Sequence, residues 1–351
     1  MATKTRLGNF FDDFELGQQL VHAPPRTVTA GDVAVYQALF GSRFAVNSSD
    51  PFARALGLPG APVDSMLVFH LVFGRTVADV SLNAIANLGY AGCRFGVPLY
   101  PGDTVVSDSR VIGLRQNKDG KTGVVYVHST GLNQRGETVL DFRRWVMVRK
   151  RDTGAAAPEA VVPTLPESVP VQVLHCPYRV VPGTYDTARS GSAFLWDDYT
   201  VGERIDHVDG MTIEEAEHML ATRLYQNTAK VHFNQHIERE GRFGKRIVYG
   251  GHVISLARAL SFNGLANALC VAAIHGGRHS APSFAGDTIY AWSEVLACDA
   301  LPGRSDIGAL RIRTVATKDR SCADFPGHDP AVADPTVVLD LDYSVLMPRR
   351  S

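Results

Sequence analysis

Phe11–Leu20, which reads FDDFELGQQL, returns in altered form at Trp196–Ile205, which reads WDDYTVGERI. Both strings place an aromatic residue, Asp-Asp, a second aromatic residue and Gly in the same order, at an offset of 196 − 11 = 185 residues. RFGVPLYPGDTV from Arg94 and RHSAPSFAGDTI from Arg278 repeat the match and both end through Gly-Asp-Thr. Because several such strings keep one order and nearly one offset, the pattern indicates a duplication into two domain-sized copies.

The duplication divides the chain into two units and a linker. We predict a first unit over residues 1–150, a linker over 151–175 and a second unit over 176–351. The linker reads RDTGAAAPEAVVPTLPESVPVQVLH, and its four prolines lack the N–H that regular ladder hydrogen bonding requires. Its small and proline residues predict an extended spacer that runs over the surface.

Each unit is expected to begin with a short helix. Thr29 is followed three residues later by Asp32, and Thr212 is followed three residues later by Glu215. A threonine with an acidic residue at this spacing is typical of a capping box at a helix N-terminus. The sequence therefore predicts helices that begin directly after both threonines.

A longer and more apolar helix is expected next in each unit. The first reads DSMLVFHLVFG from Asp64 and is expected to end at Gly74, and the second reads GGHVISLARALSFNG from Gly250 and is expected to end at Asn263-Gly264. Glycine suits the left-handed cap that closes many helices. Both helices are apolar on nearly all sides, which predicts burial in a core.

Three strands are expected after the apolar helix of the first unit, over residues 104–114, 122–132 and 138–150. They are rich in Val, Thr and aromatic residues, and the turn signals Asn117–Gly120 and Gln134–Glu137 separate them. This pattern favours an antiparallel meander. We therefore expect an α+β fold in which each unit wraps an antiparallel sheet around a long buried helix.

Composition limits the partners. The 351 residues contain 35 Lys and Arg against 36 Asp and Glu, and this balance excludes the basic field that nucleic-acid binding requires. No apolar run is long enough to span a membrane, and the first residues, MATKTRLGNFFDDFE, do not resemble a secretory signal. The five cysteines are widely spaced without a CxxC motif, which is typical of reduced thiols. We therefore expect a cytoplasmic protein.

The order of short helix, glycine-containing loop, buried helix and antiparallel strands resembles the hotdog fold of MaoC-like (R)-specific enoyl-CoA hydratases. Two joined copies resemble the double-hotdog members of that family. The resemblance implies a cofactor-independent enzyme that adds water to an α,β-unsaturated thioester, with coenzyme A as part of the substrate. The strings YQNTAKVHFN from Tyr225 and FGSRFAVNSSDPFA from Phe40 are similar to members that convert mesaconyl-CoA to β-methylmalyl-CoA. We also expect a homo-oligomer.

The family's site motif pairs an Asp with a His five residues later. Aligned on this motif, the second unit places His232 at the histidine position and Asn227 at the aspartate position. An amide cannot transfer a proton, although it can orient a water molecule. The same register in the first unit gives Ser42 and Asn47, neither of which is a general base at neutral pH. The resemblance therefore implies one catalytic site per chain, with His232 as general acid or base and Asn227 placing the water.

Substrate contacts are expected around the buried helix of the second unit. Gly250 and Gly251 begin that helix, where N–H groups and the helix dipole can stabilise charge on a thioester oxygen. Tyr249 stands before them, where relatives carry a histidine. Arg43 and Arg223 lie beside the site motifs and are candidates for binding the acyl carboxylate. Arg278 or Arg94 is the candidate for a coenzyme A phosphate.

Other functions remain open at this stage. A broader (R)-specific enoyl-CoA hydratase for neutral acyl groups, a non-catalytic acyl-CoA-binding protein and a thioesterase are all compatible with a hotdog fold. No phosphate-binding GxxxxGK[ST] loop, GxGxxG turn or GxSxG elbow occurs in the sequence. The histidine pairs His275/His279 and His232/His236 lack further ligands at fixed spacing, so we expect no metal site.

Overall fold

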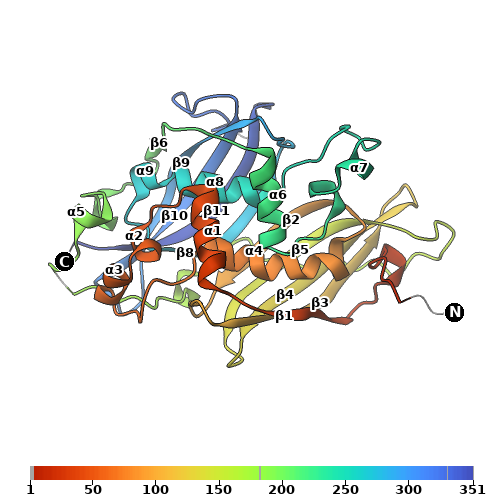
Figure 1. The fold of residues 1–351 in the computed structure, drawn as a ribbon, viewed down its shortest axis with the longest axis horizontal. Helices are drawn as coiled ribbons and strands as arrows, with labels where there is room; N and C mark the ends of the chain where they lie inside the picture. The colour runs from red at the N-terminus through yellow and green to blue at the C-terminus, as the bar shows by residue number, and fades with distance from the viewer. Residues whose placement is uncertain (1–3, 182, 330, 351) are drawn as a thin grey trace.

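A computed structural model of the chain describes residues 4–181, 183–329 and 331–350. Within these ranges one continuous antiparallel sheet of eleven strands runs through the molecule in the order β1-β3-β4-β5-β2-β8-β11-β10-β9-β6, and β7 pairs with β9. The strands of the first unit and those of the second unit occupy the two halves of this sheet (Figure 1). The strand bounds are β1 Gln19–Thr27, β2 Ala84–Phe95, β3 Thr104–Gln116, β4 Thr122–Asn133, β5 Thr138–Arg149, β6 Arg204–Asp206, β7 Met211–Thr212, β8 Cys270–His279, β9 Thr288–Ala300, β10 Ile307–Lys318 and β11 Val337–Pro348.

The two halves of the sheet join at a single strand pair. β2 of the first unit pairs antiparallel with β8 of the second unit, with Tyr90 opposite Gly277 and Arg94 opposite Ala273. Each unit therefore completes the sheet of the other within one chain. Because β2 and β8 are each the edge strand of their own unit, this pairing removes two open edges that would otherwise be exposed.

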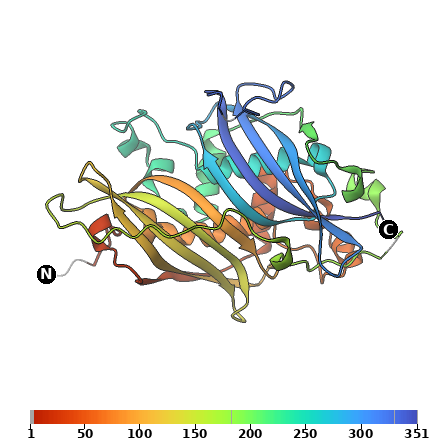
Figure 2. The same ribbon diagram turned by 180° about the vertical axis from the view of Figure 1, so that it is seen from behind.

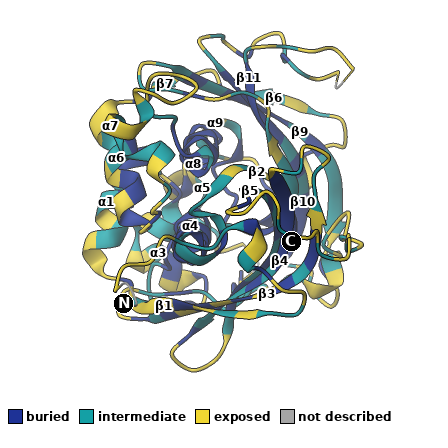
Figure 3. Cartoon of the chain, turned by 90° about the vertical axis from the view of Figure 1, so that its right-hand side faces the viewer, coloured by how far each residue is buried: buried dark blue, intermediate teal, exposed yellow. Residues whose placement is uncertain are grey.

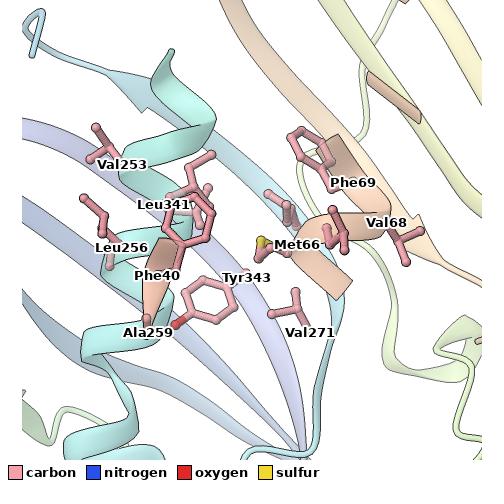
Figure 4. Close-up of a cluster of buried hydrophobic side chains, with 14 of the residues drawn as sticks. Phe40, Met66, Val68, Phe69, Val253, Leu256, Ala259, Val271, Leu341 and Tyr343 are labelled. Carbon is pink, nitrogen blue, oxygen red and sulfur yellow. The ribbon is translucent and has the colours of Figure 1, made fainter. Parts of the chain in front are cut away.

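Two helices, α4 (Ser65–Thr76) and α8 (Gly250–Leu260), form the centre of the molecule. Every residue from Met66 to Thr76 and from Gly251 to Leu260 is buried, and the sheet curves around both helices (Figure 3). Figure 4 shows apolar side chains of the two helices facing β8 and β11, and Phe40 lies between the two helices. The arrangement is the expected α+β fold, in which each antiparallel half-sheet wraps around one buried helix.

Shorter helices cover the side of the molecule that the sheet leaves open. In Figure 3, α1 (Ala30–Phe40) and α6 (Glu215–Leu224) lie on the side of α4 and α8 that faces away from the sheet. The remaining α-helices are α2 Ala45–Ser48, α3 Asp50–Ala55, α5 Thr187–Ser190, α7 Gln235–Glu238 and α9 Phe262–Leu265. The single-turn and π-helical segments are η1 Phe11–Asp13, η2 Val77–Ser81, η3 Val171–Val173, η4 Trp196–Asp198 and η5 Lys230–His232.

The duplication extends to buried polar side chains. In each unit a histidine Nε2 lies 2.8 Å from a serine Oγ, and that serine lies 2.7 Å from a second hydroxyl group. The two sets are His22, Ser109 and Ser129 in the first unit, and His207, Ser293 and Thr314 in the second. Because the members of the two sets stand 184 or 185 positions apart in the sequence, the sequence offset describes a real structural equivalence.

Most of the predicted elements are confirmed. The three predicted strands of the first unit are β3, β4 and β5, and their starts at Thr104, Thr122 and Thr138 agree with the prediction. Thr29 caps α1 through a complete capping box with Asp32. The helix from Gly250 ends at Leu260, slightly earlier than expected, and Gly264 (φ 106°) then breaks the helical path.

Two predicted helix boundaries are wrong. Gly74 does not end α4, which continues to Thr76 and then into η2. A side chain at position 74 would place its Cβ 2.0 Å from the carbonyl oxygen of Tyr225, so this glycine permits a close approach between segments and does not serve as a cap. Thr212 does not cap α6, because it belongs to β7 and its hydroxyl group lies 2.8 Å from that of Thr288.

The segment predicted as a linker contains one isolated bridge and one 3₁₀ turn and otherwise runs without regular structure. Figure 2 shows it crossing the outer face of the first unit's sheet, where Val161 and Leu114 exchange backbone hydrogen bonds of 2.8 and 2.9 Å. The division of the chain at residues 150 and 176 stays a prediction. Among the helices of the described ranges, none combines the length and the apolarity that crossing a membrane requires.

Candidate active site

The candidate site is built on the loop that follows α6. This helix ends at Leu224 with Tyr225 as its C-cap, and Gln226 then takes a left-handed conformation (φ 54°) that turns the chain sharply. Asn227 is buried, and its Oδ1 accepts a hydrogen bond of 3.0 Å from the N–H of Ala229. The turn of η5 then brings His232 back toward the start of α8. We call residues 225–234 the site loop.

His232 is oriented by a backbone carbonyl. Its Nδ1 lies 3.0 Å from the carbonyl oxygen of Ile247, and its ring lies 5.6 Å from that of Tyr249. A carbonyl oxygen only accepts hydrogen bonds, so Nδ1 must carry the proton and Nε2 keeps its lone pair. Burial lowers the pKa of His232 to about 4, which keeps the imidazole neutral at physiological pH. The arrangement provides a neutral base.

The first turn of α8 lies beside this base. Gly250 and Gly251 are its first residues, and the N–H groups of a first helical turn have no partner within the helix. The ring of His279 packs so closely on Gly250 that a Cβ there would lie 2.5 Å from its Cε1. A Cβ at Gly251 would lie 2.4 Å from the ring of Tyr249 and 2.5 Å from that of His70. A larger residue at either position would have to displace these rings, so glycine suits the close packing at the start of α8.

A cluster of buried polar side chains around His70 packs against the site loop. The ring of His70 lies 4.5 Å from that of Tyr225, and its Nε2 lies 2.8 Å from Oγ of Ser255, which also accepts a hydrogen bond of 2.9 Å from Tyr36. Burial lowers the pKa of His70 to about 3, so this ring is neutral. The Tyr225 hydroxyl group has no hydrogen-bond partner among the described residues. The cluster therefore fixes the site loop against both central helices.

The first unit carries the same architecture without a base. Asn47 Nδ2 donates a hydrogen bond of 3.0 Å to the carbonyl oxygen of Pro62, which stands 185 positions before Ile247. Asn47 thus makes the contact that His232 makes in the second unit. A cavity beside it is lined by Asn47, Pro62, Ser65 and Phe95 among other residues. The register deduced from the sequence therefore holds at the level of single hydrogen bonds.

The structure gathers some of the predicted site residues and leaves others apart. His232, Asn227, Tyr249, Gly250 and Gly251 lie on the site loop and on the segment that begins α8. Among the described residues, the side chains of the three predicted arginines make no hydrogen bond or ion pair with them. All three side chains are exposed, and they are Arg43, Arg223 and Arg278.

Each arginine has a different setting. Arg43 packs 4.6 Å over the ring of Phe262, which lies roughly 18 Å along the helical path from Gly250 at 1.5 Å per residue. Arg278 pairs with Asp340 at 3.4 Å, and because neighbouring strand residues face opposite sides, it points away from the face that His279 occupies. Arg223 lies in the last turn of α6, close to the site loop in the sequence but exposed.

Sequence reasoning missed two side chains at the site. His279 touches Gly250, and its buried Nε2 has no partner among the described residues, while burial lowers its pKa to about 4. The repeat register offered a signal for His279, because the first unit carries Phe95 at the equivalent position and the histidine therefore belongs to the second unit alone. Arg75 reaches the site loop from α4. In the described part of the chain no three His, Cys, Asp or Glu side chains gather as a metal site would require.

The fold and the site together define a double-hotdog protein with a partly buried histidine close to the N-terminus of α8. A family model described as MaoC-like domain matches residues 13–132. The chain is 72% identical over its full length to a β-methylmalyl-CoA dehydratase from Chloroflexus aurantiacus, of which it covers 100%. It belongs to the MaoC-like dehydratase family.

More particular similarities follow within that family. The chain is 55% identical to a mesaconyl-CoA hydratase from Cereibacter sphaeroides, over 99% of this chain and 100% of that protein. Among solved structures, a putative MaoC domain dehydratase from Chloroflexus aurantiacus matches with a TM-score of 0.98, 71% identity and complete coverage of both chains. A Mycobacterium tuberculosis protein described as a double hotdog fold matches with a TM-score of 0.76 and 25% identity, over 97% of this chain and 99% of that one. The expected fold class is therefore confirmed.

Proposed function

We propose that the chain reversibly adds water to mesaconyl-CoA and forms β-methylmalyl-CoA. Relatives named for the two directions of this reaction match it over nearly their full length, at 72% and 55% identity. The observation that carries the chemistry is the neutral imidazole of His232 close to the start of α8, whose Nε2 makes no hydrogen bond to any described residue. It supplies the base that hydration of a conjugated thioester requires.

The reaction proceeds with one water molecule and no other reactant. The water oxygen bonds to the β-carbon of the thioester while Nε2 of His232 takes one of its protons. The π electrons move toward the thioester oxygen, where N–H groups of Gly250 and Gly251 stabilise the developing negative charge. The α-carbon then receives a proton from the imidazolium, which returns His232 to its neutral form. The same steps in reverse order remove water from β-methylmalyl-CoA.

Asn227 assists by position. Its Oδ1 is held by the N–H of Ala229, which leaves Nδ2 to donate to the attacking water. Because an amide does not take up a proton, the transfer itself rests on His232. Tyr249 packs between His232 and Phe73, with ring separations of 5.6 and 5.7 Å, and shields the imidazole from bulk water.

Cofactor, location and assembly belong to the same proposal. Hydration moves no net electrons, so the reaction needs no redox cofactor, and coenzyme A enters and leaves as part of the thioester. We place the protein in the cytoplasm as a homo-oligomer, without nucleic-acid or membrane partners. The near-balanced charge and the widely spaced cysteines of the sequence support this placement.

The test is a direct assay of the conjugated thioester. Purified protein is expected to remove the ultraviolet absorbance of mesaconyl-CoA until equilibrium, without releasing free thiol. Rapid loss with crotonyl-CoA but none with mesaconyl-CoA would instead indicate an enoyl-CoA hydratase for neutral acyl groups. Thiol release would indicate a thioesterase, and binding without turnover an acyl-CoA-binding protein.

A further inference from the structure

Arg75 is a buried cation that has no partner of opposite charge in the part of the chain that the structure describes. It lies in the last turn of α4, and only 4% of its surface is exposed. Nη1 donates a long hydrogen bond of 3.4 Å to Oε1 of Gln226, whereas Nε and Nη2 are buried and have no partner among the described residues. Buried charges are costly unless they are paired, so such an arrangement calls for an explanation.

The two unpartnered nitrogens are the pair with which this protein binds carboxylates elsewhere. In three other arginines Nε and Nη2 grip both oxygens of one aspartate, at distances between 2.6 and 3.0 Å. These pairs are Arg304 with Asp306, Arg311 with Asp342, and Arg313 with Asp340. Arg75 presents the same planar fork, and across the described ranges no Asp or Glu oxygen lies within ion-pair distance of it. The fork has the geometry of a carboxylate site.

The fork lies next to the candidate site. Gly74 lets α4 approach so closely that a Cβ there would lie 2.0 Å from the carbonyl oxygen of Tyr225. Arg75 follows Gly74, and the residue it contacts, Gln226, directly precedes Asn227. The guanidinium therefore lies on the Asn227 side of the site loop, next to the residue that precedes the proposed water-holding amide.

The chemistry of the proposed substrate requires a cation on that side. In mesaconyl-CoA the free carboxylate is attached to the β-carbon, the atom that receives the water. A carboxylate side chain at position 227 would therefore repel the substrate at close range, and this chain carries the neutral Asn227. A neutral side chain beside an unpaired cation makes a site suited to an anionic acyl group.

We propose that Arg75 binds the free carboxylate of the acyl group through Nε and Nη2, and so selects dicarboxylic over neutral acyl thioesters. The inference rests on the proposed function. The side chain of Gln226 is exposed and held only by the long contact, so it moves aside as the carboxylate enters. Arg75 then acquires the charged partner that the protein itself does not supply.

Arg144 provides a matched control. It is 1% exposed and also lacks a carboxylate partner among the described side chains, but its guanidinium lies 4.3 Å over the ring of Phe73 and donates a hydrogen bond of 2.6 Å to Oγ1 of Thr76. These contacts hold the sheet to α4, which is a structural role. Its replacement should therefore lower stability and affect all substrates alike.

The experiment compares mesaconyl-CoA with crotonyl-CoA, which lacks the carboxylate. Arg75→Gln is expected to lower kcat/KM for mesaconyl-CoA by about 100-fold or more, as loss of one member of a buried charge pair does, with crotonyl-CoA changed less than about threefold. Arg75→Lys, which keeps the charge but loses the fork, should fall between wild type and Arg75→Gln. Asn227→Asp should also impair mesaconyl-CoA more than crotonyl-CoA.

Folding is followed separately. Because Arg75→Gln removes an unpaired buried charge, its melting temperature without ligand should equal or exceed that of wild type, whereas that of Arg144→Gln should fall. Equal losses on both substrates in Arg75→Gln, or no loss on mesaconyl-CoA, would overturn the role of Arg75 while leaving the proposed function intact. A wild-type protein that hydrates crotonyl-CoA but not mesaconyl-CoA would overturn both.

Discussion

Asn47 and His232 make the same hydrogen bond in the two halves of the molecule. Asn47 Nδ2 donates to the carbonyl oxygen of Pro62 and His232 Nδ1 to that of Ile247, each at 3.0 Å. An asparagine therefore fits the geometry of the histidine position but cannot accept a proton there. The first unit thus shows how an amide is accommodated where the proposed base stands in the second unit.

That equivalence yields the first prediction. His232→Asn should lower turnover of mesaconyl-CoA by about 10² to 10⁴-fold, the usual contribution of a general acid–base group. Its melting temperature should stay close to that of wild type, because the amide can keep the bond to Ile247. Thermal unfolding and the absorbance assay on the same preparation check both parts, and a variant with more than a tenth of wild-type turnover would contradict the assignment of the base.

Gly250→Ala tests the start of α8. The new methyl group would lie 2.5 Å from the His279 ring and would displace that ring or the thioester, so turnover should fall by at least about tenfold. Gly31→Ala is the matched control, because Gly31 stands in the first turn of α1 and a methyl group there would lie 3.5 Å from its nearest neighbour. Steady-state kinetics of both variants decide the matter, and equal turnover in the two would remove Gly250 from the site.

Ser255→Ala tests the buried polar cluster around His70. The substitution leaves Nε2 of His70 and the hydroxyl group of Tyr36 without their buried partner. Each unsatisfied group costs about 1–3 kcal/mol, so the free energy of unfolding should decrease by at least that amount. Urea unfolding measures the change, with Ser280→Ala, at an exposed position, as the control. An unchanged unfolding midpoint would show that the cluster does not hold the two helices together.

Acid should destabilise the native protein over a defined interval. Burial lowers the pKa of His70 and His252 to about 3, and that of His207, His232 and His279 to about 4. The unfolded chain, with histidine pKa values near 6.5, binds protons that the native chain does not bind. Stability should therefore rise with pH between about 4 and 6.5 and be lost as pH falls through this interval.

Unfolding free energies measured at several pH values in that interval give the number of protons taken up on unfolding. His252→Phe removes one of the titrating groups while keeping an aromatic ring against Phe40, at a ring separation of 4.8 Å in the native protein. The slope of stability against pH should therefore decrease by about one proton. A slope unchanged by this variant would show that His252 is not held neutral by the fold.

The architecture could be predicted from the order of residues alone. The offset between Phe11 and Trp196 revealed the two units, and the alternating strands and apolar helices predicted a sheet wrapped around each buried helix. The resemblance to the family motif pointed to His232, and the same offset then paired it with Asn47. These features could be predicted because periodicity, turn chemistry and repetition are written in local stretches of chain.

Local patterns misled where distant segments compete for the same residue. Gly74 is a residue type typical of helix caps, but here its lack of a side chain lets Tyr225 pack close to α4. Thr212 has the residue type of a cap, but its hydroxyl group contacts that of Thr288 in the neighbouring strand. The arginines chosen for their nearness to the motif in the sequence, Arg43 and Arg223, have exposed side chains that make no hydrogen bond or ion pair with the site loop among the described residues.

The groups that surround the base, and the charge they carry, are set by tertiary packing. His279 at the end of β8 packs against Gly250 at the start of α8, and Arg75 contacts Gln226, which is 151 residues away in the sequence. Whether an arginine is solvated, paired or buried alone depends on the atoms that packing brings around it, and so does the pKa of a histidine. Sequence spacing does not encode those distances, because they arise when the two central helices pack against each other inside one sheet.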